Sequence, residues 1–288
     1  MKTGVYLTLA ACGMGALCLA SPSSDRWPVR ERETIEKTLP LSGSPNRLVI
    51  DNLQGYVHAT AFSGSSVHIT AHKIIRAEAD ADLAEGKRDV KLDISEKPGQ
   101  LSVRYDAPWR CSGEGRPCSK EGRRLFYEVI YDIDVQVPRE ARIVLSTVNG
   151  GDIQVDGLDG NFDVGNVNGA IRMNAIGGSG DAHTVNGAVT VHFAKNPSGP
   201  CSFKSVNGAL DAFFPRDLSA DLVFKTLNGG IFSDFDVSAR STPVVQSERR
   251  DGKYVYHGNR MSAGRAGSGG PELSFQTLNG SIRLHRGQ

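Results

Sequence analysis

The sequence contains few of the residues on which active sites and nucleic-acid interfaces usually depend. Only two tryptophans, Trp27 and Trp109, occur in the 288 residues, so no aromatic platform for stacking sugars is indicated. The motifs Gly-x-Ser-x-Gly and His-Glu-x-x-His and a phosphate-cradling glycine loop are missing. The formal net charge is +1, and a balanced chain has no global attraction for nucleic acid. We therefore predict a protein that is not an enzyme, with no catalytic residues, no cofactor, no metal and no nucleic-acid partner.

Long hydrophobic runs are also scarce, and the one near the start predicts an export signal. Lys2 gives a positive start, residues 5–19 are uncharged and mostly apolar, and small residues at Cys18 and Ala20 precede the expected cleavage after Ala20. The run falls short of the ~20 residues that a membrane span needs. A lipobox ending at Cys12 offers the alternative of a lipid anchor. We expect an exported chain, periplasmic or at the cell surface, with no transmembrane segment after signal removal.

Cysteine is rare in the mature chain, where only Cys111, Cys118 and Cys201 remain. Cys111 and Cys118 end a polar, glycine-rich loop, and in an oxidising compartment a disulfide that closes this loop is the expected product. A zinc pair is the alternative, but no second pair of ligands lies nearby in the sequence. Cys201 occupies an apolar position of the repeat described next, so we predict that it is free and buried.

The strongest positive signal is a short unit that occurs six times, in which a small polar residue and Val or Leu precede Asn-Gly. The six turn pairs are Asn149–Gly150, Asn168–Gly169, Asn186–Gly187, Asn207–Gly208, Asn228–Gly229 and Asn279–Gly280. Steps between the asparagines are 19, 18, 21, 21 and 51 residues. Internal repetition at a nearly constant period indicates a repeat architecture.

Apolar residues alternate with polar ones on both sides of each turn, as in Ile143/Leu145 before Asn149 and Ile171/Met173 after Asn168. This period of two predicts a strand, a turn and a second strand with one buried face. Asn-Gly is expected to supply the positive φ that the turn requires. A single unit cannot bury its face alone, so we expect the copies to stack, with the asparagines hydrogen-bonded along one corner.

Two all-β architectures fit this pattern. One is a β-solenoid, similar to a parallel β-helix or β-roll, with about one coil per repeat; the other is a series of antiparallel hairpins in a sandwich or roll. The recurring Thr-Val or Thr-Leu favours the solenoid, because a hairpin needs only its turn pair. If the coils follow chain order, Phe203 and Phe224 have neighbours on both sides and Phe275 lies at the end.

The flanking segments complete the expected organisation. A degenerate first repeat is indicated at 51–57, a short helix at 76–86, and a hairpin at 246–256. The domains we expect are a signal peptide at 1–20, an N-terminal extension at 21–46, a β-rich part with the helix and the Cys111–Cys118 loop at 47–140, and the repeat array at 141–288 with an insertion at 240–270.

Together these residues resemble the DUF4097-type putative adhesin family of bacterial β-strand repeat proteins. The matching features are the signal, the Ala/Glu-rich helix, the Asn-Gly repeats and the ending Leu273-Ser-Phe-Gln-Thr-Leu-Asn-Gly-Ser-Ile-Arg-Leu284, and the resemblance covers about 48–284. The Cys111–Cys118 loop and the insertion after Val237 depart from it. The resemblance implies a solenoid-like fold and a role in adhesion or envelope interaction, and it offers no catalytic residues to carry over.

Our functional hypothesis is a noncatalytic, adhesin-like envelope or surface protein whose partner is an unidentified protein or polysaccharide. A carbohydrate-active lyase or hydrolase is the first alternative, and it requires convergent carboxylates. Its candidates are Asp152, Asp156, Asp159 and Asp163, although Asp beside Gly is also ordinary turn chemistry. A periplasmic envelope-stress signalling domain is the second alternative, and it rests on family context alone. His68 and His72 share one strand face, where solvent exposure is a simpler explanation than a metal site.

Overall fold

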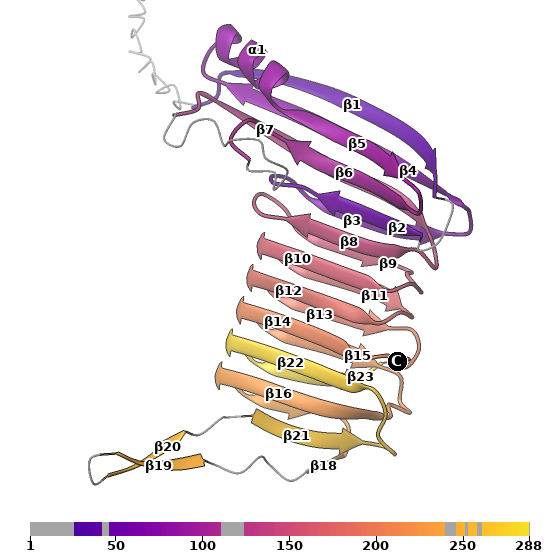
Figure 1. Ribbon diagram of the computed structural model, residues 1–288, viewed down its shortest axis with the longest axis vertical. Coiled ribbons are helices and arrows are strands. Elements are labelled where there is room, and N and C mark those ends of the chain that lie inside the picture. The colour runs from indigo at the N-terminus through magenta and orange to yellow at the C-terminus, as the bar shows by residue number, and fades with distance from the viewer. Residues whose placement is uncertain are drawn as a thin grey trace, which may run out of the picture.

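A computed structural model describes residues 26–41, 46–110, 124–239, 246–250, 253–257 and 261–287. The described chain is predominantly β, with one helix, a ten-stranded sheet that we call sheet A and an eleven-stranded sheet that we call sheet B (Figure 1). The signal peptide, Cys12 and the Cys111–Cys118 pair lie outside the described residues, so export, the lipid anchor and the disulfide stay predictions.

The N-terminal part forms one end of both sheets. Its elements are β1 (Val29–Pro40), β2 (Arg47–Asp51), β3 (Val57–Phe62), β4 (Ser66–Ala77), α1 (Asp80–Asp89), β5 (Lys91–Lys97), β6 (Gln100–Asp106) and β7 (Tyr127–Pro138). The helix begins later than the expected residue 76, because Arg76 and Ala77 continue the alternation of β4 and Ala77 is buried. Acids in its first turn and Lys87 and Arg88 in its last turn suit the helix dipole.

Each repeat contributes one strand to each sheet. Sheet B receives β8 (Arg142–Thr147), β10 (Phe162–Asn168), β12 (Gly180–Asn186), β14 (Cys201–Asn207), β16 (Ala220–Asn228) and β22 (Glu272–Asn279). Sheet A receives β9 (Ile153–Asp156), β11 (Ile171–Ile176), β13 (Val189–Phe193), β15 (Leu210–Phe214), β17 (Ile231–Ser233) and β23 (Ile282–Arg286).

Repeats pair in parallel, with equivalent positions in register, as in Phe203 beside Phe275 and Asn207 beside Asn279. The two strands joined by an Asn-Gly turn lie in different sheets, so each turn is a corner and the hairpin alternative is wrong for the repeats. The sheets are not closed, and the two-sheet, all-β description is therefore the level at which the fold class is established. The expected degenerate repeat at 51–57 stacks on the first full one, since β2 pairs with β8 and β3 with β9.

The order of the stack differs from the order of the chain. In sheet B β22 lies between β14 and β16, and in sheet A β23 lies between β15 and β17 (Figure 1). The expectation that Phe275 marks the end of the stack is therefore wrong. After β16 and β17 the chain forms the insertion and then returns, and the last repeat, β22 and β23, inserts between the repeat of β14 and β15 and that of β16 and β17.

The insertion supplies the strand that covers the outer edge of β16. It contains β18 (Val237–Ala239), β19 (Gln246–Arg250), β20 (Lys253–His257) and β21 (Met261–Ala266). Strand β21 pairs antiparallel with both β16 and β18 and so extends sheet B beyond the last repeat, while β19 and β20 form a separate antiparallel pair. Edge pairing of this kind removes an open row of hydrogen-bonding groups from a parallel stack.

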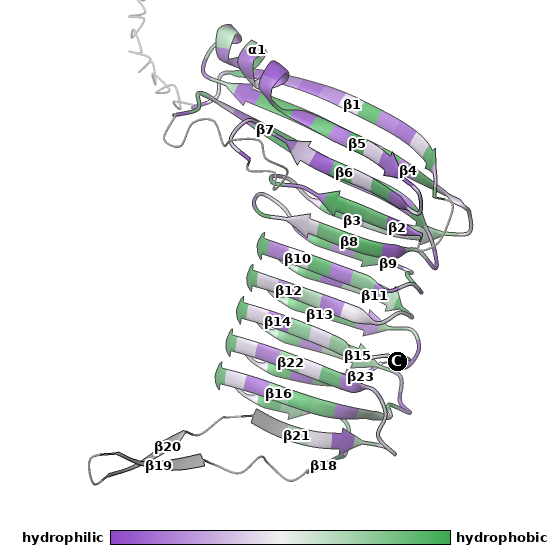
Figure 2. Cartoon of the chain, in the orientation of Figure 1, coloured by the Kyte–Doolittle hydropathy of each residue, from purple (hydrophilic) through white to green (hydrophobic). Residues whose placement is uncertain are grey.

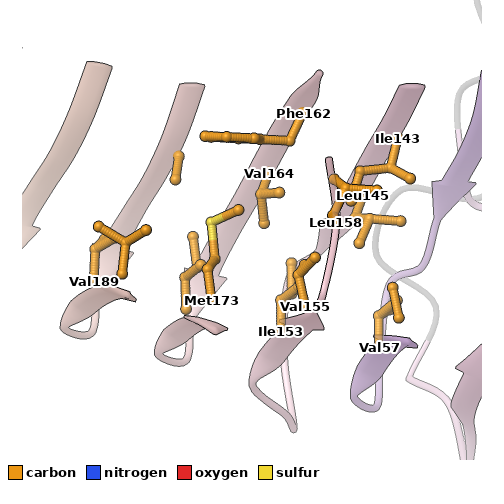
Figure 3. Packing of buried hydrophobic residues seen from close by; sticks show 14 of the residues in the cluster. Val57, Ile143, Leu145, Ile153, Val155, Leu158, Phe162, Val164, Met173 and Val189 are labelled. Atoms are coloured by element: carbon orange, nitrogen blue, oxygen red, sulfur yellow. The ribbon is translucent and has the colours of Figure 1, made fainter. Parts of the chain in front are cut away.

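The core lies between the two sheets. Figure 3 shows Leu145 and Val164 on one side and Val155 and Met173 on the other, all of them fully buried. Cys201 is 3% exposed and pairs in register with Leu273, which agrees with its predicted apolar position. Burial raises the pKa of its thiol, which makes it a poor nucleophile.

The corner residues have two structural roles. The asparagines form a ladder of side-chain hydrogen bonds 2.7–2.8 Å long, and its order is Asn149, Asn168, Asn186, Asn207, Asn279, Asn228. The small polar residue two places earlier is buried and bonds to the turn of the adjacent coil, as in Thr277 Oγ1 donating to the Gly208 carbonyl at 3.0 Å.

The glycines are required for a reason other than the expected one. Among the six turn glycines only Gly150 has a positive φ, of 81°. At Gly280 a Cβ would lie 2.0 Å from the Gly208 carbonyl oxygen, and at Gly208 it would lie 1.9 Å from that of Gly187. Adjacent turns approach so closely that no side chain fits between them, and this spacing, not φ, selects glycine.

Candidate functional site

The residue just before each turn asparagine faces outward from sheet B. We call Val148, Val167, Val185, Val206, Leu278 and Leu227, in their order across the sheet, the apolar row. Four of its members are exposed large hydrophobics, from 37% exposed at Val185 to 51% at Leu227. In Figure 2 hydrophobic colour gathers at one end of β10, β12, β14, β22 and β16. Scattered exposed apolar residues are ordinary, whereas a line of them on neighbouring strands makes this face the candidate site.

Four members of the apolar row, Val185, Val206, Leu278 and Leu227, form one wall of a groove of about 890 Å³ across β12, β14, β22 and β16. The next outward residues along the strands are polar: His183, Lys204, Gln276 and Lys225, and beyond them Asp163, Asp181 and Ser202. The groove therefore has an aliphatic side, from which a bound partner would exclude water, and a polar side that can orient the partner.

Charge in the groove is divided along the stack. Asp163 and Asp181 are in register on β10 and β12, whereas Lys204 and Lys225 lie on β14 and β16. Asp181 and both lysines are exposed. One end of the groove is thus acidic and the other basic.

The four aspartates that the enzyme alternative requires do not converge. Asp152 accepts hydrogen bonds from Arg172 and from the Ala170 N–H, and Asp156 accepts them from Gln154 and Asn174. Asp159 lies 3.0 Å from Lys195 at the connection before β10, and Asp163 is on the opposite sheet from Asp156. Each therefore has a local explanation, and they do not form the facing pair that glycoside cleavage needs.

The environment of Asp152 is that of an ion-paired surface acid. Burial by itself would raise its pKa, but the hydrogen bonds from Arg172 and Ala170 outweigh this effect and lower the pKa below its usual value. An acid that is fully ionised at neutral pH is suited to holding a strand pair together and not to donating a proton.

The histidines on the N-terminal strands have neighbours that account for them. His68 and His72 make ring-nitrogen hydrogen bonds to Thr38 and Thr34 on β1, at 3.0 and 3.1 Å. Nearby, His58 lies 3.4 Å from Asp134 over a hollow of about 380 Å³. Within the described ranges, no three His, Cys, Asp or Glu residues are grouped so that they could hold a metal ion.

Among the described residues α1 is the one helix, and no helix there has the length and apolar character of a membrane span. From the sequence we recognised the Val or Leu of each repeat as a mark of the fold and did not assign it to the surface. The signal was available, since alternation counted from the asparagine places the preceding residue on the outer face.

Comparison with known proteins leaves the family open. No family model and no curated protein match the chain, so membership of the DUF4097-type family stays an expectation. Among solved structures, a "putative cell adhesion protein" from Clostridium sporogenes is 8% identical with a TM-score of 0.45, covering 89% of this chain and 100% of that one. A "putative adhesin" from Bacteroides fragilis is 10% identical with a TM-score of 0.37, covering 88% and 97%. At these values the likeness carries no argument about function.

Proposed function

We propose that the chain is a noncatalytic, exported envelope or surface protein that binds another surface protein along the sheet B groove, in the manner of an adhesin. The observation that carries the proposal is the apolar row, in which four neighbouring strands of sheet B each expose a large hydrophobic side chain. Burial of apolar surface contributes roughly 25 cal/mol per Å², so a partner that covers the row gains most of its binding free energy there.

A protein partner fits the groove better than a polysaccharide does. The apolar part of the lining is aliphatic, and the lining carries no Trp, Tyr or Phe, the residues on which sugars stack. Acidic side chains lie at one end of the groove and basic ones at the other, and this pattern complements a surface that itself carries both signs of charge. Export and the absence of catalysis are parts of the same proposal, as is the finer fold class, a β-solenoid with one coil per repeat, which the parallel register supports.

The test is binding of the purified exported protein to cells of its own source. Leu278→Asp places a charge within the exposed part of the apolar row and is expected to reduce bound protein by roughly tenfold or more, because a buried unpaired carboxylate costs several kcal/mol. Phe232→Asp is the matched control, since Phe232 is also an exposed hydrophobic, 57% exposed, but lies on sheet A.

Both variants should unfold at the temperature of the wild type, because both side chains are exposed. The proposal is refuted if Leu278→Asp binds cells as well as the wild type does, or if both substitutions reduce binding equally.

A further inference from the structure

We infer that the partner in the sheet B groove is a second copy of this chain, so that the protein joins to itself through the apolar row. This inference rests on the proposed function and narrows it to one occupant. The groove carries its own complement, with an aliphatic line along β12, β14, β22 and β16, acids at one end and lysines at the other. A surface that is complementary to itself under a two-fold rotation is the requirement for a symmetric dimer.

The order of strands determines which rotation fits. Across sheet B the members of the apolar row follow the strand order, with Val148 directly after the end of β8 and the others on β10, β12, β14, β22 and β16. A two-fold axis parallel to the strands, placed between β12 and β14, sets Val185 of one copy opposite Val206 of the other. The same axis sets Val167 opposite Leu278 and Val148 opposite Leu227. All six positions of the row are then covered by apolar side chains, and none is left over.

The charged residues favour this axis over its neighbours. It places Lys204 on β14 opposite β12, the strand that carries Asp181 two residues away, about 6.6 Å along the strand and within reach of a lysine side chain. A rotation centred on β14 would instead bring Lys204 against Lys204 of the other copy, and like charges facing each other oppose docking. Two equivalent Lys204–Asp181 pairs therefore set the register.

The size of the face predicts the strength of the association. Six strands spaced about 4.8 Å apart span roughly 24 Å, and a seven-residue strand spans about 23 Å, which gives a face of roughly 500 Å². Standard stable interfaces bury about 800 Å² per partner. We therefore expect a weak dimer with a Kd in the micromolar range, the strength at which many copies on two surfaces together give firm adhesion.

The experiment is sedimentation equilibrium of the purified exported protein over about 10 to 500 μM, the range that brackets a micromolar Kd. The wild type is expected to show a monomer–dimer equilibrium. Lys204→Asp and Asp181→Lys should each weaken it by about tenfold or more, because each places like charges face to face. The double variant, which exchanges the two charges, should return to within about threefold of the wild type.

Val206→Asp should abolish the dimer, and Phe232→Asp on sheet A should leave it unchanged. The inference is overturned if the wild type stays monomeric at every concentration or if Val206→Asp dimerises as the wild type does. It is also overturned if the double variant dimerises no more tightly than the single variants. If the protein is monomeric but Leu278→Asp still removes cell binding, the proposed function stands with a different protein as partner. If the wild type forms the expected dimer but Leu278→Asp does not reduce cell binding, the proposed function is wrong and the dimer inference is not.

Discussion

Phe275→Ala is expected to be the most destabilising truncation among the phenylalanines of sheet B, although Phe275 belongs to the last repeat in the chain. Its ring is fully buried and stacks between Phe203 and Phe224, with centroid distances of 5.3 and 5.7 Å. Truncation of a buried Phe to Ala typically costs about 3–5 kcal/mol, and the cost rises with the cavity that remains. Rigid coils on both sides prevent collapse of the cavity, so we expect the upper part of this range.

Phe224 provides the informative comparison. It lies on β16, the last repeat strand of the stack, with β21 on its other side, and it is 4% exposed. The edge can relax, so Phe224→Ala is expected at the lower end of the same range. Urea unfolding monitored by circular dichroism gives both values, and Phe232→Ala is an exposed control expected within about 0.5 kcal/mol of the wild type. A result in which Phe275→Ala is the mildest would mean that the repeats stack in chain order.

Gly280→Ala is expected to be the second severe change. An added Cβ would lie 2.0 Å from the Gly208 carbonyl oxygen, which belongs to the backbone of the next coil and cannot rotate away. Overpacking in a well-packed interior typically costs about 1–3 kcal/mol and occasionally more. We expect at least the upper value, because relief requires two hydrogen-bonded coils to separate.

Gly199→Ala is the matched control for this substitution. Its Cβ would approach Ser179 at 3.4 Å, an ordinary contact, and the free energy of unfolding should change by less than about 1 kcal/mol. Equal effects at the two positions would show that the turns are not in close contact, and that Asn-Gly serves only local turn geometry.

The local pattern of the repeats could be predicted from the sequence because it depends on neighbouring residues. Alternation around each Asn-Gly placed Leu273 and Cys201 in the core, and the recurring asparagines anticipated the ladder. The order of coils could not be predicted in this way. The Asn228–Asn279 step differs from the others only in length, and whether the chain continues outward or returns to fill a slot depends on long-range packing.

The reason for the glycines was likewise out of reach. Asn-Gly most often occurs where a turn needs a positive φ. The close approach of Gly280 to Gly208 joins residues 72 positions apart in the chain, so the local sequence does not reveal it. The candidate site could have been found in part, because the alternation of side chains along each strand places Val206 and Leu278 on the outer face. The sequence does not show the order of the strands in the sheet, which brings these residues together with Lys204 and Asp181 in one groove.

The most direct test of the central claim, that a protein partner lies on the apolar row, is photo-crosslinking in living cells. A benzophenone amino acid placed at Leu278 should yield discrete protein adducts on irradiation, and one placed at Phe232 on sheet A should not. Identification of the adducts by mass spectrometry then separates a second copy of the chain from another protein. Adducts only to lipid or glycan, identical products from both positions, or no product at Leu278 would contradict the account.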